Sequence, residues 1–186
     1  MAYLDQEPRV KENFSYYQSI KQNVKFLRET IIFVSESRNA GTDCGTVSLC
    51  SDVSKELSLE VSVKQRFMRT FRFKIIDNNL MTRPCYRFDS DGPPHYNIID
   101  DIPLKKRRVN TPHFHEFNKD GVEIAYQTDV LEKQEEYILS DRSFALAHFA
   151  HEENIKYTTS PEICKDGELF SPDNSLEDPL LGESFK

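Results

Sequence analysis

The sequence predicts an α+β fold: an antiparallel sheet of about five strands, flanked by an N-terminal and a C-terminal helix. Three observations predict it. Apolar residues recur at three- and four-residue steps near the N-terminus, alternate with polar residues from Leu57 onward, and form a second helical segment near residue 150. The 186 residues suit one domain. We expect that domain to span residues 1–157 and an acidic, disordered tail to occupy residues 158–186.

The first element is an amphipathic helix over residues 12–35. Its apolar positions recur with helical spacing, and they are Tyr17, Ile20, Val24, Leu27 and Ile31. The end of this segment, "TIIFVS", is β-branched, so a strand is the alternative there. The next stretch, "SRNAGTDCGTVSLCSD", is rich in Gly, Ser, Thr and Asp and is interpreted as a loop.

Two strands follow, over about 56–64 and 66–77, although one long bent strand would give the same pattern. Their odd positions carry the apolar residues Leu59, Val61, Val63, Phe67, Phe71, Phe73 and Ile75. Arg66, Arg72 and Lys74 therefore line the opposite face. That face is either solvated or directed toward phosphate groups.

Turn residues and helix caps predict the remaining elements. The pair "NN" predicts a turn before a third strand over 81–89, which either lies at an edge or begins after Pro84. "SDGPPH" is expected to be a loop. "NKDG" joins strands over 112–117 and 122–128, with Gly121 at positive φ. A helix over 140–155 is capped by Ser140 or Asp141.

Several classes of protein are excluded by composition. No run of about 18 apolar residues predicts a membrane span. The start, "MAYLDQEPRV", does not resemble a signal peptide, so we expect a cytoplasmic protein. The four cysteines form no C-x-x-C pair and are expected to be reduced thiols.

Charge is distributed unevenly along the chain. The net charge of −7 comes almost entirely from residues 151–186, which hold nine acids and three bases. Residues 64–108 hold eleven bases and five acids. The basic middle would suit the phosphate backbone of RNA or an acidic partner, and the acidic tail would bind a basic partner, such as a host protein, or fold back.

The strongest candidate for a functional site lies around "RVNTPHFHEFNKDG". Residues two apart in a strand point to the same face, so His113 and His115 project together. Arg87 and Asp89 are also two apart on the preceding strand. His95 lies in the loop between these two strands.

Two chemistries fit these five residues. In the first, which needs no cofactor, one neutral imidazole removes the 2′-hydroxyl proton of RNA and one imidazolium protonates the leaving oxygen. Arg87 would then stabilise charge on phosphorus, while Asp89 would orient a histidine. In the second, the imidazoles and a carboxylate bind zinc or manganese. The alternative to both is that these are ordinary surface or hydrogen-bonding residues.

A basic run stands directly before the paired histidines. Together with two basic residues of the strands, it forms the predicted substrate-binding set: Lys105, Lys106, Arg107, Arg108, Arg72 and Lys74. The alternative for the run is a solvated loop. For His148 and His151, on the last helix, a structural role is the expectation.

Together these residues resemble the TumE-type toxins of bacterial toxin–antitoxin pairs and related prophage proteins. The resemblance covers residues 57–150 and is specific across 86–117, where the matching pattern is Arg87-x-Asp89, Asp91-Gly92, His95, Asn97 and Pro112-His113-x-His115. It implies a small α+β ribonuclease, encoded beside a helix-turn-helix antitoxin, whose site contains Arg87, Asp89, His95, His113 and His115. The N-terminal helix, Pro93-Pro94, the basic run and the acidic tail depart from that pattern.

Three functional hypotheses follow. The first is a toxin-type endoribonuclease that uses histidine acid–base catalysis. The second is a prophage or mobile-element inhibitor that binds a host defence or nucleic-acid-processing protein, in which the histidines are structural. The third is a zinc-binding structural domain without catalysis.

Overall fold

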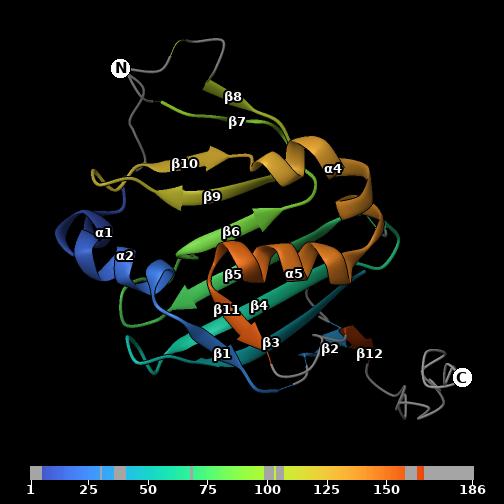
Figure 1. Ribbon diagram of the computed structural model, residues 1–186, viewed down its shortest axis with the longest axis horizontal. Coiled ribbons are helices and arrows are strands. Elements are labelled where there is room, and N and C mark those ends of the chain that lie inside the picture. The colour runs from blue at the N-terminus through green and yellow to red at the C-terminus, as the bar shows by residue number, and fades with distance from the viewer. Residues whose placement is uncertain are drawn as a thin grey trace, which may run out of the picture.

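The protein has the α+β fold that the sequence predicts, built on one large and mostly antiparallel sheet (Figure 1). The computed structural model describes residues 6–29, 31–35, 41–67, 69–98, 103, 107–157 and 163–165. The helices are α1 (Pro8–Glu12), α2 (Phe14–Gln22), α4 (Asp129–Ser140) and α5 (Arg142–Glu152). The strands are β1 (Lys25–Leu27), β2 (Ile31–Ser35), β3 (Thr42–Cys50), β4 (Leu57–Lys64), β5 (Phe71–Asp77), β6 (Tyr86–Asp89), β7 (His95–Tyr96), β8 (Arg108–Val109), β9 (His113–Phe117), β10 (Glu123–Tyr126), β11 (Ile155–Tyr157) and β12 (Ile163–Lys165).

The main sheet is larger than the five strands expected, because ten of these strands belong to it. Eight follow one another in the order β10-β9-β6-β5-β4-β3-β1-β11, and β2 pairs with both β3 and β12. The β1–β11 and β2–β12 pairs are parallel, whereas the other pairs are antiparallel. The strand β12 comes from the predicted acidic tail, and the rest of that tail lies outside the described residues.

The extra strands come from segments in which the sequence predicts helix or loop. The helix predicted over 12–35 is wrong beyond Gln22, since β1 and β2 follow it, and the β-branched "TIIFVS" forms the strand that is its alternative. The side chain of Lys25 is buried and donates to the backbone oxygens of Ile20 and Asn23 at the end of α2. It satisfies carbonyls that a continuing helix would have paired internally. The stretch interpreted as a loop contains β3, in which Val47 and Leu49 are buried on alternate positions.

The elements after β3 agree better with the predictions made from the sequence. The two alternating strands are β4 and β5, separated by a turn, and "NKDG" joins β9 to β10 with Gly121 at a φ of +74°. The last helix is α5, capped by Asp141, whose side chain accepts from the backbone of Ser143 and Phe144. Helix α4 is not predicted by the sequence pattern. The strand β6 begins after Pro84, but it lies inside the sheet between β5 and β9 and not at an edge.

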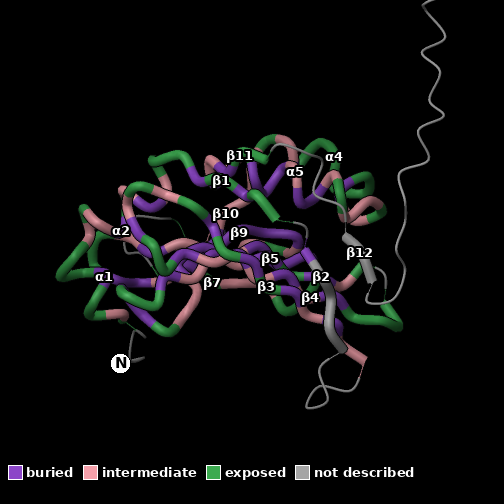
Figure 2. The backbone as a smooth tube through the Cα atoms, turned by 90° about the horizontal axis from the view of Figure 1, so that it is seen from below, coloured by how far each residue is buried: buried purple, intermediate pink, exposed green. Residues whose placement is uncertain are grey.

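One face of the sheet is covered by helices, as the edge-on view of Figure 2 shows for α4 and α5. The odd positions of β4 and β5 are buried on this face, as predicted. The prediction is wrong for Phe67, which lies before β5 and is 62% exposed. The rings of Phe73 and Phe88 stack at 5.7 Å, Phe88 meets Phe114 at 5.1 Å, and Phe149 of α5 closes on Phe73 at 5.6 Å. This aromatic layer holds three neighbouring strands in fixed register.

The opposite face carries the polar residues of the same strands. Antiparallel pairing sets Arg72 opposite Asp89 and Lys74 opposite Arg87. Separately, β7 and β8 form a two-stranded ribbon beside β10. None of the described helices is long and apolar enough to cross a membrane.

Candidate functional site

The strands β6 and β9 bring four of the five predicted site residues together. Their antiparallel register pairs Arg87 with His115 and Asp89 with His113. Cross-strand partners share a face, so all four side chains project on the same side of the sheet. The spacing in the sequence predicts each of the two pairs, and the pairing of β6 with β9 brings the pairs together.

The ribbon β7–β8 supplies the fifth residue, His95. Its ring centroid lies 5.0 Å from that of His115 and 6.4 Å from that of His113, and the latter two are 4.5 Å apart. Three imidazoles therefore meet in one cluster. His113 and His115 are 2% and 5% exposed, which makes this an interior site and not a surface patch.

His115 lies between two carboxylates. Its Nε2 is 3.2 Å from Asp89 Oδ2, and its Nδ1 is 3.3 Å from Glu123 Oε1. Neither contact has the alignment of a good hydrogen bond, so electrostatic attraction is the main interaction. Both ring nitrogens of His115 therefore face negative charge.

Arg87 links the same two carboxylates from the other side. Its Nε lies 3.0 Å from Asp89 Oδ2 and its Nη2 lies 3.2 Å from Glu123 Oε1. Burial alone would raise the pKa values of both acids. The contact with His115 and the charge of Arg87 outweigh burial, lowering the pKa of Asp89 and bringing that of Glu123 to about 2. Both acids are therefore ionised at neutral pH.

His113 has a different environment. Its Nδ1 lies 3.1 Å from the backbone oxygen of Asn110, so Nδ1 carries the proton and Nε2 keeps its lone pair. Burial, reinforced by the neighbouring His115, lowers the pKa of His113 to about 4. The ring is neutral at pH 7, and the lone pair on Nε2 can accept a proton.

A side chain from outside the histidine set holds His95 in place. Asn97, two residues along, donates from Nδ2 to the backbone oxygen of Ala125 at 2.8 Å and accepts from its N–H at 2.7 Å. Ala125 is the cross-strand partner of His115. Asn97 thus fixes the ribbon against β10 beside the cluster. Burial, followed by the charge of His115, lowers the pKa of His95.

Asp89, His113 and His115 also offer a metal-binding arrangement, because their ligand atoms lie within 4.8 Å of one another. Two imidazoles and a carboxylate are acceptable zinc ligands. A dication here would, however, face two guanidinium groups, since Arg72 Nε contacts Asp89 Oδ1 at 3.0 Å and Arg87 contacts Oδ2. A metal bound there would have to compete with these two arginines for the oxygens of Asp89.

The predicted substrate-binding residues divide into four groups. Arg72 reaches the cluster through Asp89, and half of its side chain is exposed. Lys74 instead forms an ion pair with Glu60 of β4. Arg108 is exposed and pairs in register with Tyr96 on the ribbon that carries His95, and Arg107 precedes it. Lys105 and Lys106 lie outside the described residues.

The sequence interpretation missed Glu123. Its carboxylate contacts His115, Arg87 and, at 3.1 Å, Nη2 of Arg83. The signal was present in the hairpin: a turn at "NKDG" pairs Phe117 with residue 123 and places Glu123 diagonally to His115.

The last helix plays no direct part in the cluster. His148 is buried, and its Nε2 lies 2.9 Å from Oγ1 of Thr128, the cap of α4. His151 is 84% exposed at the side chain. A structural role for His148 therefore explains its position.

The chain matches no protein-family model, and it has no significant match among the curated proteins or the solved structures.

Proposed function

We propose that the protein is a toxin-type endoribonuclease that cleaves RNA phosphodiester bonds by histidine acid–base catalysis. The observation that supports this most is the meeting of three imidazoles with two guanidinium groups around Asp89. Cleavage at a 2′-hydroxyl requires a base, an acid and positive charge near phosphorus. The cluster offers all three without a metal.

His113 is the general base in this proposal. Its anchored Nδ1 directs a lone pair on Nε2 toward the site, where it removes the proton of the 2′-hydroxyl. A pKa of about 4 makes the ring a weak base before substrate binds. The negative charge of the bound phosphodiester raises this pKa toward neutrality and strengthens the base when the substrate is present.

His115 is the general acid. Asp89 and Glu123 stabilise its imidazolium form and orient the ring, which protonates the leaving 5′ oxygen. The resulting neutral ring and the protonated His113 then exchange roles when water opens the cyclic phosphate. Arg87 and the more exposed Arg72 balance the charge that develops on the phosphoryl oxygens. His95 contributes a third donor or acceptor at the edge of the cluster.

The test is cleavage of a fluorescent single-stranded RNA by the purified protein in the presence of a metal chelator. We expect cleavage by the unchanged protein and by His151→Ala, the matched control on α5. His113→Ala and His115→Ala should reduce the rate at least 100-fold while their circular dichroism stays unchanged. Full cleavage by both variants would contradict the catalytic assignment.

The inhibitor hypothesis depends on the acidic tail, most of which lies outside the described residues. The ribonuclease proposal, by contrast, depends on described contacts. We therefore take it as the conclusion.

A further inference from the structure

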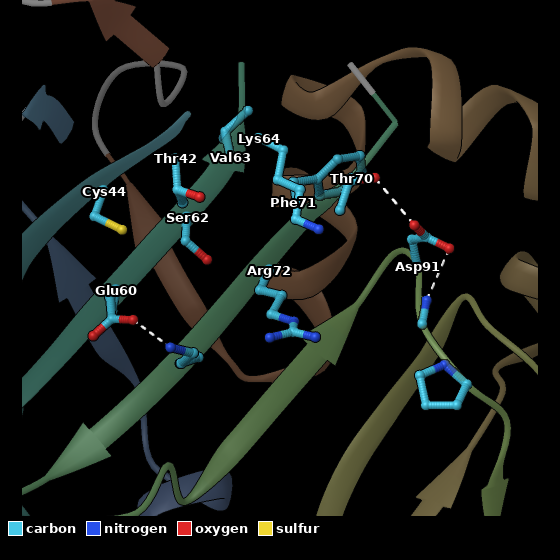
Figure 3. Close-up of a pocket in the computed structure, with 13 residues that line it drawn as sticks. Thr42, Cys44, Glu60, Ser62, Val63, Lys64, Thr70, Phe71, Arg72 and Asp91 are labelled. Atoms are coloured by element: carbon cyan, nitrogen blue, oxygen red, sulfur yellow. Dashed lines mark hydrogen bonds and ion pairs between the residues drawn. The ribbon is translucent and has the colours of Figure 1, made fainter. Parts of the chain in front are cut away.

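A groove of about 870 Å³ lies on the helix-free face of the sheet. Figure 3 shows the residues that line it. It is lined by residues of β3, β4 and β5 and of the segments around them: Thr42, Cys44, Glu60, Ser62, Val63, Lys64, Thr70, Phe71, Arg72, Lys74, Asp91, Gly92 and Pro93. Arg72 belongs to both places, because its guanidinium lies in the groove and its Nε contacts Asp89. The groove therefore begins where the cluster ends.

We propose that this groove is a guanine-selective subsite that receives one nucleotide of single-stranded RNA beside the cleaved phosphodiester. This inference rests on the proposed function, because the substrate of an endoribonuclease continues on both sides of the bond that is cut. A volume of about 870 Å³ lies within the range of about 300–1,000 Å³ that proteins use for small ligands. The groove is therefore large enough for one nucleotide.

Base selectivity follows from the polar character of the lining. Proteins that bind single strands without sequence preference stack bases on exposed aromatic rings. The aromatic residue of this groove is Phe71, which is only 1% exposed because its ring faces the helix-covered side. Hydroxyl, carboxylate and ammonium groups line the groove instead. A base held there is recognised by hydrogen bonds at its edge.

Guanine fits the charged pair on the floor of the groove. Glu60 and Lys74 face each other across β4 and β5 and form an ion pair, with side chains only about a quarter exposed. The carboxylate accepts from neighbouring N–H groups, and the ammonium donates to a carbonyl. The Watson–Crick edge of guanine presents two N–H donors and then O6, in that order. Uracil and adenine each have a single donor group on this edge, and cytosine has one donor beside two acceptors.

The position of the pair suits a base whose phosphate lies at the cluster. Arg87 of β6 is paired in register with Lys74, which is paired in turn with Glu60. Glu60 therefore lies two strands from Arg87, roughly 10 Å away at ordinary strand spacing. Arg72, two residues from Lys74 on β5, pairs with Asp89 and can contact the phosphate there.

The experiment measures binding of the four nucleoside 3′-monophosphates to the unchanged protein by calorimetry. These compounds contain no phosphodiester bond, so the measurement reports binding without cleavage. We expect guanosine 3′-monophosphate to bind at least tenfold more tightly than the other three. Glu60→Gln should remove that preference, whereas Glu132→Gln, an exposed control on α4, should keep it. Ser62→Trp, which fills the groove and leaves the ion pair intact, should weaken binding of all four.

The outcomes separate this inference from the proposed function. Equal affinity for the four nucleotides, or a guanine preference that survives both Glu60→Gln and Ser62→Trp, overturns the guanine subsite even where RNA is cleaved. Guanine-selective binding by a protein that cuts no RNA supports the subsite and contradicts the proposed ribonuclease activity.

Discussion

The rings of His113 and His115 lie 4.5 Å apart on one face of β9, yet they contact different partners. His113 holds its Nδ1 proton on the neutral carbonyl of Asn110, whereas His115 lies between the carboxylates of Asp89 and Glu123. Burial lowers the pKa of His113 to about 4 and keeps its ring neutral at pH 7, whereas His115 faces two negative charges. Two histidines with such different partners can take the different roles of base and acid.

The pH dependence of cleavage should reveal the pKa of the general base, His113. A base is active when deprotonated, so kcat/KM should fall as pH drops through the pKa of His113 in the substrate-free protein, which is about 4. We expect a roughly tenfold loss of kcat/KM per pH unit well below pH 4, and almost complete deprotonation of the base by about pH 5.5. The measurement is kcat/KM on a short RNA, with circular dichroism at each pH to show that the protein stays folded. An acidic limb centred near the ordinary histidine pKa of about 6.5 would contradict the assignment.

Replacing Glu123 should change how stability depends on pH. Its folded pKa, about 2, is below the ordinary value of 4.5, so Glu123 stabilises the fold above pH 4.5, and this contribution is lost as pH falls through 2. Glu123→Gln should lower the free energy of unfolding at pH 7 by up to about 3 kcal/mol. The difference from the unchanged protein should shrink by about 2 kcal/mol at pH 3. Urea unfolding at both pH values measures it. A difference that does not vary with pH would disagree with the ion pairs that Glu123 forms with Arg87 and His115.

A second buried acid should behave in the opposite way. Glu153 is 1% exposed, and burial raises its pKa to about 7 despite the nearby charges of Lys21 and Lys25. A raised pKa means that ionisation of Glu153 destabilises the fold as pH rises from 4.5 through 7. The free energy of unfolding of Glu153→Gln should therefore rise by about 2 kcal/mol, relative to that of the unchanged protein, between pH 5 and pH 8. Urea unfolding at the two pH values provides the test. A variant that becomes less stable than the unchanged protein as the pH rises would contradict the raised pKa of Glu153.

Much of this arrangement is predictable from the sequence, for a physical reason. Alternation in a strand fixes which residues share a face, so the spacing by itself pairs Arg87 with Asp89 and His113 with His115. The turn at "NKDG" likewise sets the β9–β10 hairpin. Contacts between strands that are distant in the sequence are harder to predict, since they depend on sheet order.

The N-terminal third shows why the rest could not be predicted. Leu27 and Ile31 fit the helical spacing from Tyr17, yet they are buried in β1 and β2. Pairing of this segment with β3, β11 and β12 makes it form strands, although its apolar spacing also fits a helix. The contact of Arg72 with Asp89 was missed for the same reason, because it requires β5 and β6 to be neighbours in this register.

Asn97 should matter for catalysis although it has no place in the proton transfers. Its two hydrogen bonds to Ala125 fix the ribbon that carries His95, and Asn97→Ala would release that ribbon. Displacement of a catalytic group by about 1 Å can cost up to about 100-fold in rate. We expect kcat to fall about 10- to 100-fold while the affinity for guanosine 3′-monophosphate is unchanged. Asn13→Ala, on an exposed asparagine, serves as the control. An unchanged kcat in Asn97→Ala would mean that His95 needs no such anchor.

The most direct test replaces the attacking group of the substrate and leaves the protein intact. In the proposed reaction His113 takes a proton from the 2′-hydroxyl, so an RNA that carries a 2′-O-methyl group at every position should not be cut. The unmodified RNA should yield products that end in a 2′,3′-cyclic phosphate, detectable by mass spectrometry. Cleavage of the methylated RNA at a comparable rate would contradict acid–base catalysis at a 2′-hydroxyl by this cluster.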